Sequence, residues 1–202
     1  STRFPKKVLK KIKDKTIIQF LVERLSLSKR IDQLVVAIPD NNHNKELKQH
    51  LTQLNCKVFL GNENDVLSRY YNAALKFKSD IVIRITADCP LIDPFMLDGM
   101  VDEFINCKVD YCSNTLLPHF PDGMDIEIFN FNSLKNAYLN AKTDFHREHV
   151  TPYIKENNLT NFNNISDNFL NMLKKNKIKS QIIGREKTPF SIWRKMQSKR
   201  VS

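Results

Sequence analysis

One aspartate stands where the sequence changes from an apolar strand to a loop. In RITADCPLIDP, residues 84–94, the apolar run that begins at Ile81 ends at Thr86, and Asp88 follows two residues later. In sheets built from βαβ units, ligands bind at the carboxyl ends of the strands. Asp88 is therefore a candidate for binding a ligand, and a helix-capping or loop aspartate is the alternative.

A second group of polar residues lies in PDGMDIEIF, residues 121–129. A turn at Asp122-Gly123 uses the conformational freedom of glycine, and Asp125 and Glu127 then alternate with isoleucines along a predicted strand. A polar strand face of this kind suits the recognition of a hydroxyl-rich sugar. An ordinary half-exposed strand is the alternative.

The stretch FHREHV, residues 145–150, brings four chemically active residues together near the start of a predicted helix. His146 and His149 enclose Arg147 and Glu148. Two histidines three residues apart, with no further cluster of ligands, give only a weak indication of a metal site.

The charge of the chain is distributed unevenly. Of 32 Lys and Arg and 22 Asp and Glu, residues 161–202 hold ten bases and two acids. The first 160 residues are therefore nearly neutral, although the net charge is +10. This distribution argues against nucleic acid as a partner of the first part, and it indicates two parts of different origin.

Apolar runs in the sequence are short. None approaches the roughly 18 residues that a membrane span needs, and no apolar signal-peptide core follows the N-terminus. The four cysteines form no CxxC pair, which favours reduced thiols over a zinc site or disulfides. We therefore expect a soluble protein in the cytoplasm, without a membrane partner.

Strand and helix patterns alternate over the first 155 residues, which predicts βαβ units and a mostly parallel sheet with helices on both faces. The predicted strands are 34–38, 57–60, 81–86, 109–113 and 125–129. The predicted helices are 16–27, 45–54, 65–77, 94–105, 133–141 and 147–155. Asn64 or Asp65 could cap the third helix, and Asp93-Pro94 is a good start for the fourth.

The N-terminal segment STRFPKKVLKKI, residues 1–12, reads as a basic, hydroxyl-bearing loop. Domains of this type usually open with a buried central strand, and here the chain begins in what looks like the loop after it. We therefore expect an N-terminally truncated domain.

Eight segments resemble, in order and spacing, the cytidylyltransferases related to the spore-coat polysaccharide, acylneuraminate and 3-deoxy-manno-octulosonate enzymes. The segments are STRFPKKVL, LVERL, VVAIPD, VFLGNENDVLSRYYNAA, DIVIRITADCPLIDP, DYCSN, PDGMDIEIF and REHVTPYI. The resemblance covers residues 1–158. It implies a three-layer nucleotide-diphospho-sugar transferase (GT-A-like) fold, and transfer of CMP from CTP to a sugar or sugar-acid acceptor with Mg²⁺ and release of pyrophosphate.

The resemblance also implies roles for particular residues. Asp88 would hold Mg²⁺ and the nucleotide, and Arg3 and Lys7 would hold the triphosphate, which together make these three the expected catalytic residues. The residue types suit nucleotidyl transfer, because this reaction spreads negative charge over phosphates that a metal and fixed cations must stabilise. The nucleotide-binding loop would also contain Ser1 and Thr2, and the acceptor side would contain Asp122, Gly123, Glu127, Arg147, Glu148 and His149.

The chain departs from the pattern of the family in two places within this region. The glycine expected between proline and lysine in the first loop is Lys6, so the approach of the backbone to phosphate could differ. A later segment with a second metal-binding acid is not found after REHVTPYI. Activity is therefore open, and an inactive fragment that keeps the fold is one of the alternatives.

The last forty residues resemble a different family. In IIGREKTPFSIWRKMQSKR, residues 182–200, the pattern is similar to the start of the synthetase domain of RelA/SpoT homologues, which make (p)ppGpp. The resemblance covers about residues 163–202 and implies four phosphate-binding candidates, Arg185, Lys187, Ser191 and Lys195. Ser191 and Lys195 lie four residues apart and so share one helix face. A basic amphipathic helix is the alternative.

These observations predict a chimera of two domains. Residues 1–158 would be a cytidylyltransferase-like domain, and residues 163–202 would be a basic, helical appendage too short to form a synthetase core. The leading hypothesis is CMP transfer in surface polysaccharide biosynthesis, by a chain that could form a homodimer. The alternatives are a (p)ppGpp synthetase-related fragment, or a basic module that binds RNA or ribosomes with strong salt dependence.

Overall fold

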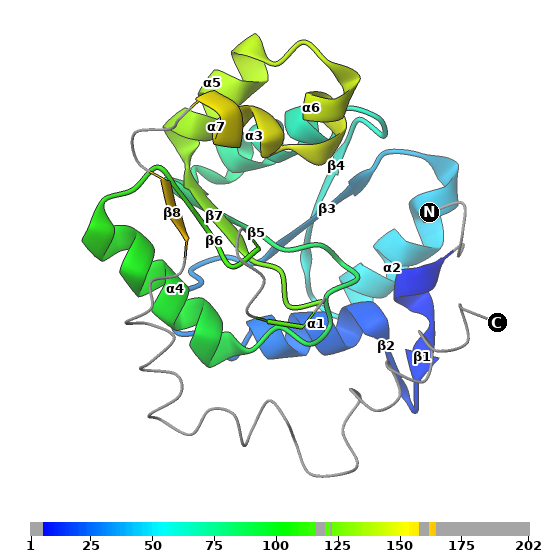
Figure 1. Ribbon diagram of the computed structural model, residues 1–202. Coiled ribbons are helices and arrows are strands. Elements are labelled where there is room, and N and C mark those ends of the chain that lie inside the picture. Colours follow the sequence, from blue (N-terminus) through cyan, green and yellow to red (C-terminus); the bar gives the residue numbers. More distant parts are fainter. Residues whose placement is uncertain (1–5, 116–119, 122, 158–161, 165–202) are drawn as a thin grey trace, which may run out of the picture.

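The structure of the protein is a computed structural model, which describes residues 6–115, 120–121, 123–157 and 162–164 (Figure 1). The strands are β1 Lys11–Ile12, β2 Lys15–Thr16, β3 Val35–Pro39, β4 Lys57–Gly61, β5 Ile81–Arg84, β6 Tyr111–Ser113, β7 Glu127–Asn130 and β8 Phe162–Asn164. The α-helices are α1 Ile17–Leu25, α2 Lys45–Gln53, α3 Val66–Phe77, α4 Pro94–Cys107, α5 Phe131–Asn140, α6 Asp144–His149 and α7 Pro152–Asn157. Two short 3₁₀ helices are η1 Lys7–Leu9 and η2 Asn42–Asn44.

The strands pair in both directions. β3 and β4 form a parallel pair, and β5, β7, β6 and β8 follow one another in a second sheet. Within this sheet β7 runs antiparallel to both β5 and β6, while β6 and β8 are parallel. β1 and β2 form a small antiparallel hairpin that the sequence pattern did not predict. The α/β class is as predicted, but the strands form a mixed arrangement where a mostly parallel sheet was expected.

The direction of β7 decides which residues meet. Because β7 is antiparallel to β5, its first residue, Glu127, lies opposite Arg84, the last residue of β5. Glu127 also pairs with Ser113, the last residue of β6. A parallel β7 would have placed Glu127 at the opposite end of β5. The antiparallel direction therefore brings the start of β7 next to the residues where β5 and β6 end.

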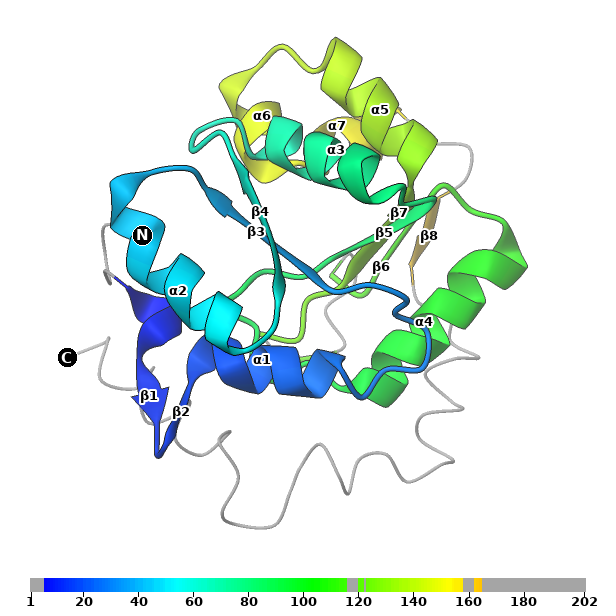
Figure 2. The same cartoon turned by 180° about the vertical axis from the view of Figure 1, so that it is seen from behind.

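Two apolar cores lie on opposite faces of the second sheet. Side chains alternate along a strand, so Ile128 packs into one core and Phe129 into the other, and both are fully buried. Helices α1, α2 and α4 contribute to the core around Ile128, and α3, α5 and α7 contribute to the core around Phe129. Figures 1 and 2 show these two groups of helices on either side of the strands. The result is the predicted three-layer architecture.

The helix starts follow the capping signals in the sequence. Asp93 caps α4 by accepting hydrogen bonds from the backbone N–H groups of Phe95 and Met96, both at 2.9 Å. Asp65 caps α3 by accepting a hydrogen bond from the N–H of Ser68 at 2.8 Å. Carboxylates at these positions satisfy donors that have no partner inside the helix.

One predicted helix is divided in two. The stretch 147–155 was expected to form one helix, but α6 ends at His149 and α7 begins at Pro152. Proline disfavours a helical conformation in the residue before it, which explains why α6 and α7 do not join. Val150, between them, has a φ of 72° and is fully buried. The break turns the side chain of Thr151 toward Glu127.

The second sheet includes a strand that follows residue 158, the predicted end of the first domain. β8 pairs with β6 in parallel, so residues 162–164 belong to the second sheet. The predicted helical appendage, from residue 165 onward, lies outside the described residues. In the part of the chain that the structure describes, no helix is both long and apolar enough to cross a membrane.

Candidate active site

Asp88 lies in the loop that follows β5, with its side chain half exposed. The hydroxyl of Thr86 donates a hydrogen bond to Asp88 Oδ1 at 2.7 Å, and Lys7 Nζ lies 2.9 Å from Asp88 Oδ2. Burial alone would raise the pKa of Asp88, but the contacts with Thr86 and Lys7 outweigh it and lower the pKa. Asp88 is therefore an ionised carboxylate that faces a cation at the sheet edge.

Lys7 reaches Asp88 from the beginning of the chain, 81 residues away. It is the first residue of η1, and the next residue, Val8, packs against the first apolar core. Lys6, at the position where the resemblance to the family implies glycine, adopts the left-handed conformation with a φ of 55°. The backbone conformation that favours glycine is thus present although the residue is lysine, at a cost of about 1 kcal/mol.

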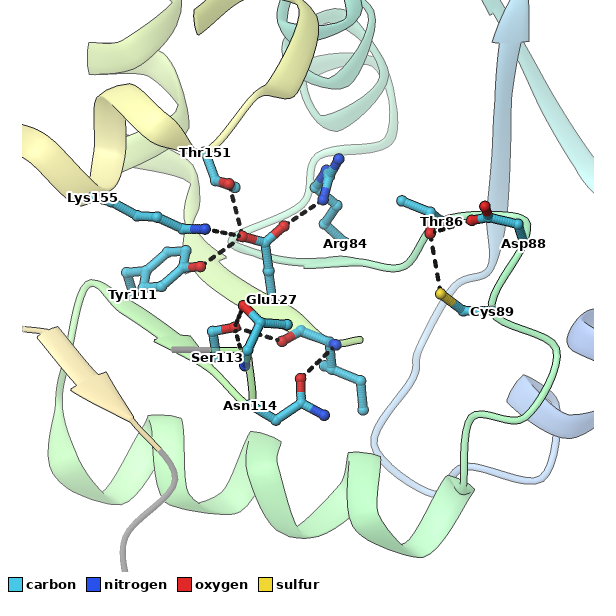
Figure 3. Close-up of polar contacts among 12 residues, drawn as sticks. Arg84, Thr86, Asp88, Cys89, Tyr111, Ser113, Asn114, Glu127, Thr151 and Lys155 are labelled. Atoms are coloured by element: carbon cyan, nitrogen blue, oxygen red, sulfur yellow. Dashed lines mark hydrogen bonds and ion pairs between the residues drawn. The ribbon is translucent and has the colours of Figure 1, made fainter. Parts of the chain in front are cut away.

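Glu127 forms the centre of a buried polar cluster (Figure 3). Its Oε1 atom accepts hydrogen bonds from Tyr111 Oη at 2.6 Å and Thr151 Oγ1 at 2.7 Å, and lies 2.9 Å from Lys155 Nζ. Its Oε2 atom accepts a hydrogen bond from Arg84 Nη1. Four elements, β5, β6, β7 and α7, contribute to this cluster, together with the segment between α6 and α7.

The charge of Glu127 is stabilised by these contacts. Burial alone would raise its pKa, but Arg84 and Lys155, together with the hydrogen bonds from Tyr111 and Thr151, lower the pKa below its ordinary value. Burial and the adjacent carboxylate raise the pKa of Tyr111, which keeps its hydroxyl protonated as a donor. The cluster is therefore an ionised carboxylate surrounded by donors.

A cavity of about 250 Å³ opens between this cluster and the loop of Asp88. Thr86 belongs to both places, because it lines the cavity and donates to Asp88. The lining residues come from the end of β5, the segment after β6, the start of β7, and the region from the end of α6 into α7; they are Arg84, Thr86, Thr115, Asp125, Glu127, His149, Thr151, Pro152 and Lys155. Charged groups and hydroxyls at such a site can bind a polar molecule next to Asp88.

The structure brings some of the predicted residues together and separates others. Glu127 and His149 line the cavity, and Gly123 has a φ of 90°, as a turn that depends on glycine would need. Arg147 instead joins α6 to its neighbours, through an ion pair with Asp65 at 3.2 Å and a hydrogen bond to the carbonyl of Tyr138. Glu148 is exposed and does not line the cavity.

Other predicted site residues lie outside the described part of the chain. They are Ser1, Thr2, Arg3, Asp122, Arg185, Lys187, Ser191 and Lys195. Their assignments remain predictions.

Sequence reasoning missed Arg84 and Lys155. The signal for Arg84 was present, because a charged residue within the apolar run 81–86 needs a partner. Lys155 lies one helical turn after Thr151, the residue before α7, so the two side chains lie on the same side of the helix. That signal was not specific, because exposed lysines are common on helices.

Metal-binding groups are sparse in this site. No group of three or more His, Cys, Asp or Glu side chains that could hold a metal ion occurs within the described residues. The four cysteines are free thiols. Asp88 is thus a single carboxylate, a donor set that suits an ion whose other ligands come from a bound nucleotide and water.

The sequence is similar to that of two curated relatives. An uncharacterised protein of Methanocaldococcus jannaschii is 39% identical over 159 residues, which are 78% of this chain and 63% of the relative. The spore coat polysaccharide biosynthesis protein SpsF of Bacillus subtilis is 34% identical over 160 residues, 77% of this chain and 65% of that protein. The chain thus spans slightly less than two thirds of the length of these relatives.

Solved structures resemble the fold over most of the chain. A cytidylyltransferase from Leptospira borgpetersenii matches with a TM-score of 0.78 and 29% identity, covering 93% of this chain and 94% of that one. The structure of CMP:2-keto-3-deoxy-manno-octonic acid synthetase in complex with CTP matches with a TM-score of 0.64 over 90% of this chain and 94% of that one. Its identity is 16%, so this likeness concerns the fold alone.

The cytidylyltransferase family model matches residues 1–195. This match includes most of the region, 163–202, that resembled the start of a (p)ppGpp synthetase domain. The comparisons give that resemblance no support, nor the chimera inferred from it. The match covers nearly the whole sequence and includes the loop of Lys7, the loop of Asp88 and the cluster of Glu127. The chain belongs to the cytidylyltransferase family.

Proposed function

We propose that the protein transfers CMP from CTP to a sugar or sugar-acid acceptor in surface polysaccharide biosynthesis. The observation that carries this proposal is the pairing of Lys7 with Asp88 at 2.9 Å, next to Thr86, which lines a cavity with room for the acceptor. The names of the relatives support this proposal, since one is a spore coat polysaccharide biosynthesis protein and a solved structure at 29% identity is a cytidylyltransferase. A cytoplasmic location and a homodimer belong to the same proposal.

The reaction divides between the two sides of the site. A hydroxyl oxygen of the acceptor would attack the α-phosphorus of CTP, the bond to the bridging oxygen would break, and pyrophosphate would leave. The hydroxyl proton would pass to water. Lys7 would contact the phosphates and stabilise the charge that develops there. The cavity would orient the acceptor, which makes the attack effectively intramolecular.

The residues around Asp88 fit Mg²⁺ that arrives with the nucleotide. Mg²⁺ bound to a nucleotide needs only one or two carboxylates, because phosphate oxygens and water complete its coordination. Asp88 is ionised and half exposed, so it can supply one of these. When bound, Mg²⁺ would neutralise charge on the phosphates. Lys7, which pairs with the carboxylate of Asp88 in the structure, would then contact the phosphates instead.

A binding experiment on matched aspartates tests this proposal. Asp102 is a suitable control for Asp88, because each is about half exposed and each pairs with one cation, Asp102 with Arg30 at 2.7 Å. By isothermal titration calorimetry with CTP and Mg²⁺, Asp88→Asn should weaken binding at least about tenfold. Asp102→Asn should bind CTP as the unchanged protein does. Equal affinity in the Asp88 variant, or equal affinity of the unchanged protein with Mg²⁺ and with EDTA, would contradict the assignment of Asp88.

Transfer itself needs a second measurement. Release of pyrophosphate from CTP on addition of 3-deoxy-manno-octulosonate or glucose 1-phosphate would establish the reaction. Binding of CTP without release of pyrophosphate would favour the alternative of an inactive member that keeps the nucleotide site.

A further inference from the structure

The Glu127 cluster, which forms part of the cavity lining, carries more positive than negative charge. Arg84 and Lys155 both contact Glu127, so the buried cluster holds two cations and one carboxylate. Asp125 also lines the cavity, but it is exposed, and water screens its charge more strongly than that of the buried groups. The cluster of Arg84, Glu127 and Lys155 therefore presents one unit of surplus positive charge beside Asp88.

Glu127 has little capacity left for a ligand. Only 5% of the residue is exposed, and it accepts from Tyr111, Thr151, Lys155 and Arg84. Three of these contacts are at Oε1 and one is at Oε2, so Oε1 is fully used and Oε2 keeps one lone pair. The burial of Glu127 limits the access of a sugar hydroxyl to that oxygen. Its contacts instead fix the positions of the two cations.

Lys155 is the cation that remains available at the cavity. Its side chain is 32% exposed, compared with 18% for Arg84. An ammonium group has three N–H donors, and the contact with Glu127 at 2.9 Å uses one of them. Figure 3 shows Lys155 extending from α7 toward Glu127, with Thr151 close by. Two N–H donors of Lys155, which Glu127 holds in position, are thus left for an oxygen atom in the cavity.

The guanidinium of Arg84 also keeps some bonding capacity. Within the described residues its Nε atom is buried without a hydrogen-bond partner, while Nη1 donates to Glu127. The hydroxyls of Thr86 and Thr151 also line the cavity, but each donates its one proton elsewhere, to Asp88 and to Glu127. The donors left for a ligand are therefore those of the cations, and positive charge matches an oxyanion better than it matches an uncharged group.

We propose that Lys155 binds an oxyanion, a carboxylate or a phosphate, carried by the acceptor sugar, and that Glu127 is the positioning residue that holds Lys155. This inference rests on the proposed function, because it takes the cavity as the acceptor site. Thr86 contacts Asp88 and lines the cavity, so an acceptor anchored at Lys155 lies next to the expected position of the α-phosphate. The acceptor is then an anionic sugar, and a neutral hexose is a poor substrate.

Binding of three probes, without CTP, tests the charge of the acceptor. The probes are 3-deoxy-manno-octulosonate for a carboxylate, glucose 1-phosphate for a phosphate, and glucose as the neutral sugar. NMR titration should show at least one anionic probe binding about tenfold or more tightly than glucose. The anionic probe that binds identifies the source of the oxyanion. Equal binding of glucose, or no binding of either anionic probe, would overturn the proposal.

Variants of one lysine identify the binding group. Lys155→Met should weaken the anionic probe by about 10- to 100-fold, and Lys155→Arg should retain most of the affinity because it keeps the charge. Lys135→Met is the control, since Lys135 is an exposed lysine of α5 away from the cavity. Unchanged affinity in the folded Lys155→Met variant, checked by circular dichroism, would exclude Lys155.

The positioning role of Glu127 needs a readout that a loss of stability alone would not change. Glu127→Asp keeps the charge but shortens the side chain, so it cannot hold both cations in place. We expect it to weaken the anionic probe about tenfold while the affinity for CTP with Mg²⁺ stays within twofold. A parallel loss of both affinities, or of neither, would contradict this role. The CTP titration also separates the proposals: without CTP binding the proposed function fails, whereas anion binding at Lys155 is judged by the probes alone.

Discussion

At the scale of single residues, two ion pairs define the site, and they differ in burial. Lys7–Asp88 is partly exposed, with 31% and 50% of the side chains accessible, whereas Arg84–Glu127 has 18% and 6% accessible. An exposed pair can open and exchange its partner for a ligand at small cost. A buried pair cannot lose one partner without leaving an uncompensated charge. The first pair therefore suits binding, and the second suits positioning.

Lys7, in η1, should contribute to nucleotide binding, and Lys15, in β2, should not. Lys15 is a matched control, because it pairs with Glu23 at 2.7 Å and is 37% exposed. Lys7→Met should lower the affinity for CTP with Mg²⁺ about tenfold, because a charge-assisted contact with phosphate is lost. Lys15→Met should leave this affinity unchanged. Calorimetric titration measures both, and equal effects of the two variants would mean that only the net charge counts.

Glu127 should make stability depend on pH. Its folded pKa lies below the ordinary value of 4.5, so its contribution to stability is complete above that value and is lost as the pH falls through the lower folded pKa. Glu127→Gln should cost about 3 kcal/mol at pH 7, because it leaves two cations without their carboxylate.

Urea unfolding at a series of pH values measures this contribution. The difference in the free energy of unfolding between the unchanged protein and Glu127→Gln should shrink below pH 4.5. Glu148→Gln, at an exposed position on α6, should change stability by less than about 0.5 kcal/mol. A difference for Glu127→Gln that is the same at every pH would show that the charge of Glu127 is not what stabilises the fold.

At the scale of elements, α4 holds the loop of Asp88 in place. The loop runs from the end of β5 to the N-terminus of α4, and Asp93 closes it by capping the helix. Asp93 is buried and α4 contributes six buried residues, so the loop ends at a fixed point. The carboxylate of Asp88 is positioned by secondary structure on both sides rather than by its own contacts alone.

Removal of the cap of α4 should therefore be costly. Asp93→Ala should lower the free energy of unfolding by about 1–2 kcal/mol, because two backbone N–H groups lose their acceptor, and the one of Met96 is buried. Thr143→Ala removes the cap of α6, where the helix is short and mostly exposed, and should cost less. Urea denaturation measures both. An equal or smaller loss for Asp93→Ala would contradict the importance of this loop anchor.

At the scale of the whole molecule, β7 links the two apolar cores. Ile128 and Phe129 are adjacent in sequence, but they belong to different cores. If the cores unfold together, urea should unfold each variant in a single transition. Ile128→Val and Phe129→Leu should each lower the free energy of unfolding by about 1 kcal/mol. Circular dichroism and tyrosine fluorescence should give the same midpoint for each variant. Two transitions, with each variant shifting only one, would show that the cores unfold separately.

Much of this architecture could be predicted from the local sequence pattern. β3, β4, β5, α2 and α3 lie within one or two residues of their expected bounds, because their apolar periodicity is clear, and Asp65 also caps α3. The apolar run before Asp88 correctly indicated a carboxylate at the carboxyl end of a strand. The helix pair α6 and α7 was predicted as one helix, because periodicity continued across residues 147–155 and outweighed the local effect of Pro152.

Only the tertiary structure decided which residues form the site. A strand pattern does not encode strand direction, and so Glu127 was expected on a sugar-binding strand face rather than opposite Arg84 with two cations around it. By itself the sequence determined the helix caps, the strand before Asp88 and the α/β class, because these depend on neighbouring residues. The contacts of Lys7 with Asp88 and of Lys155 with Glu127 depend on how distant segments pack, and no local pattern contains that information.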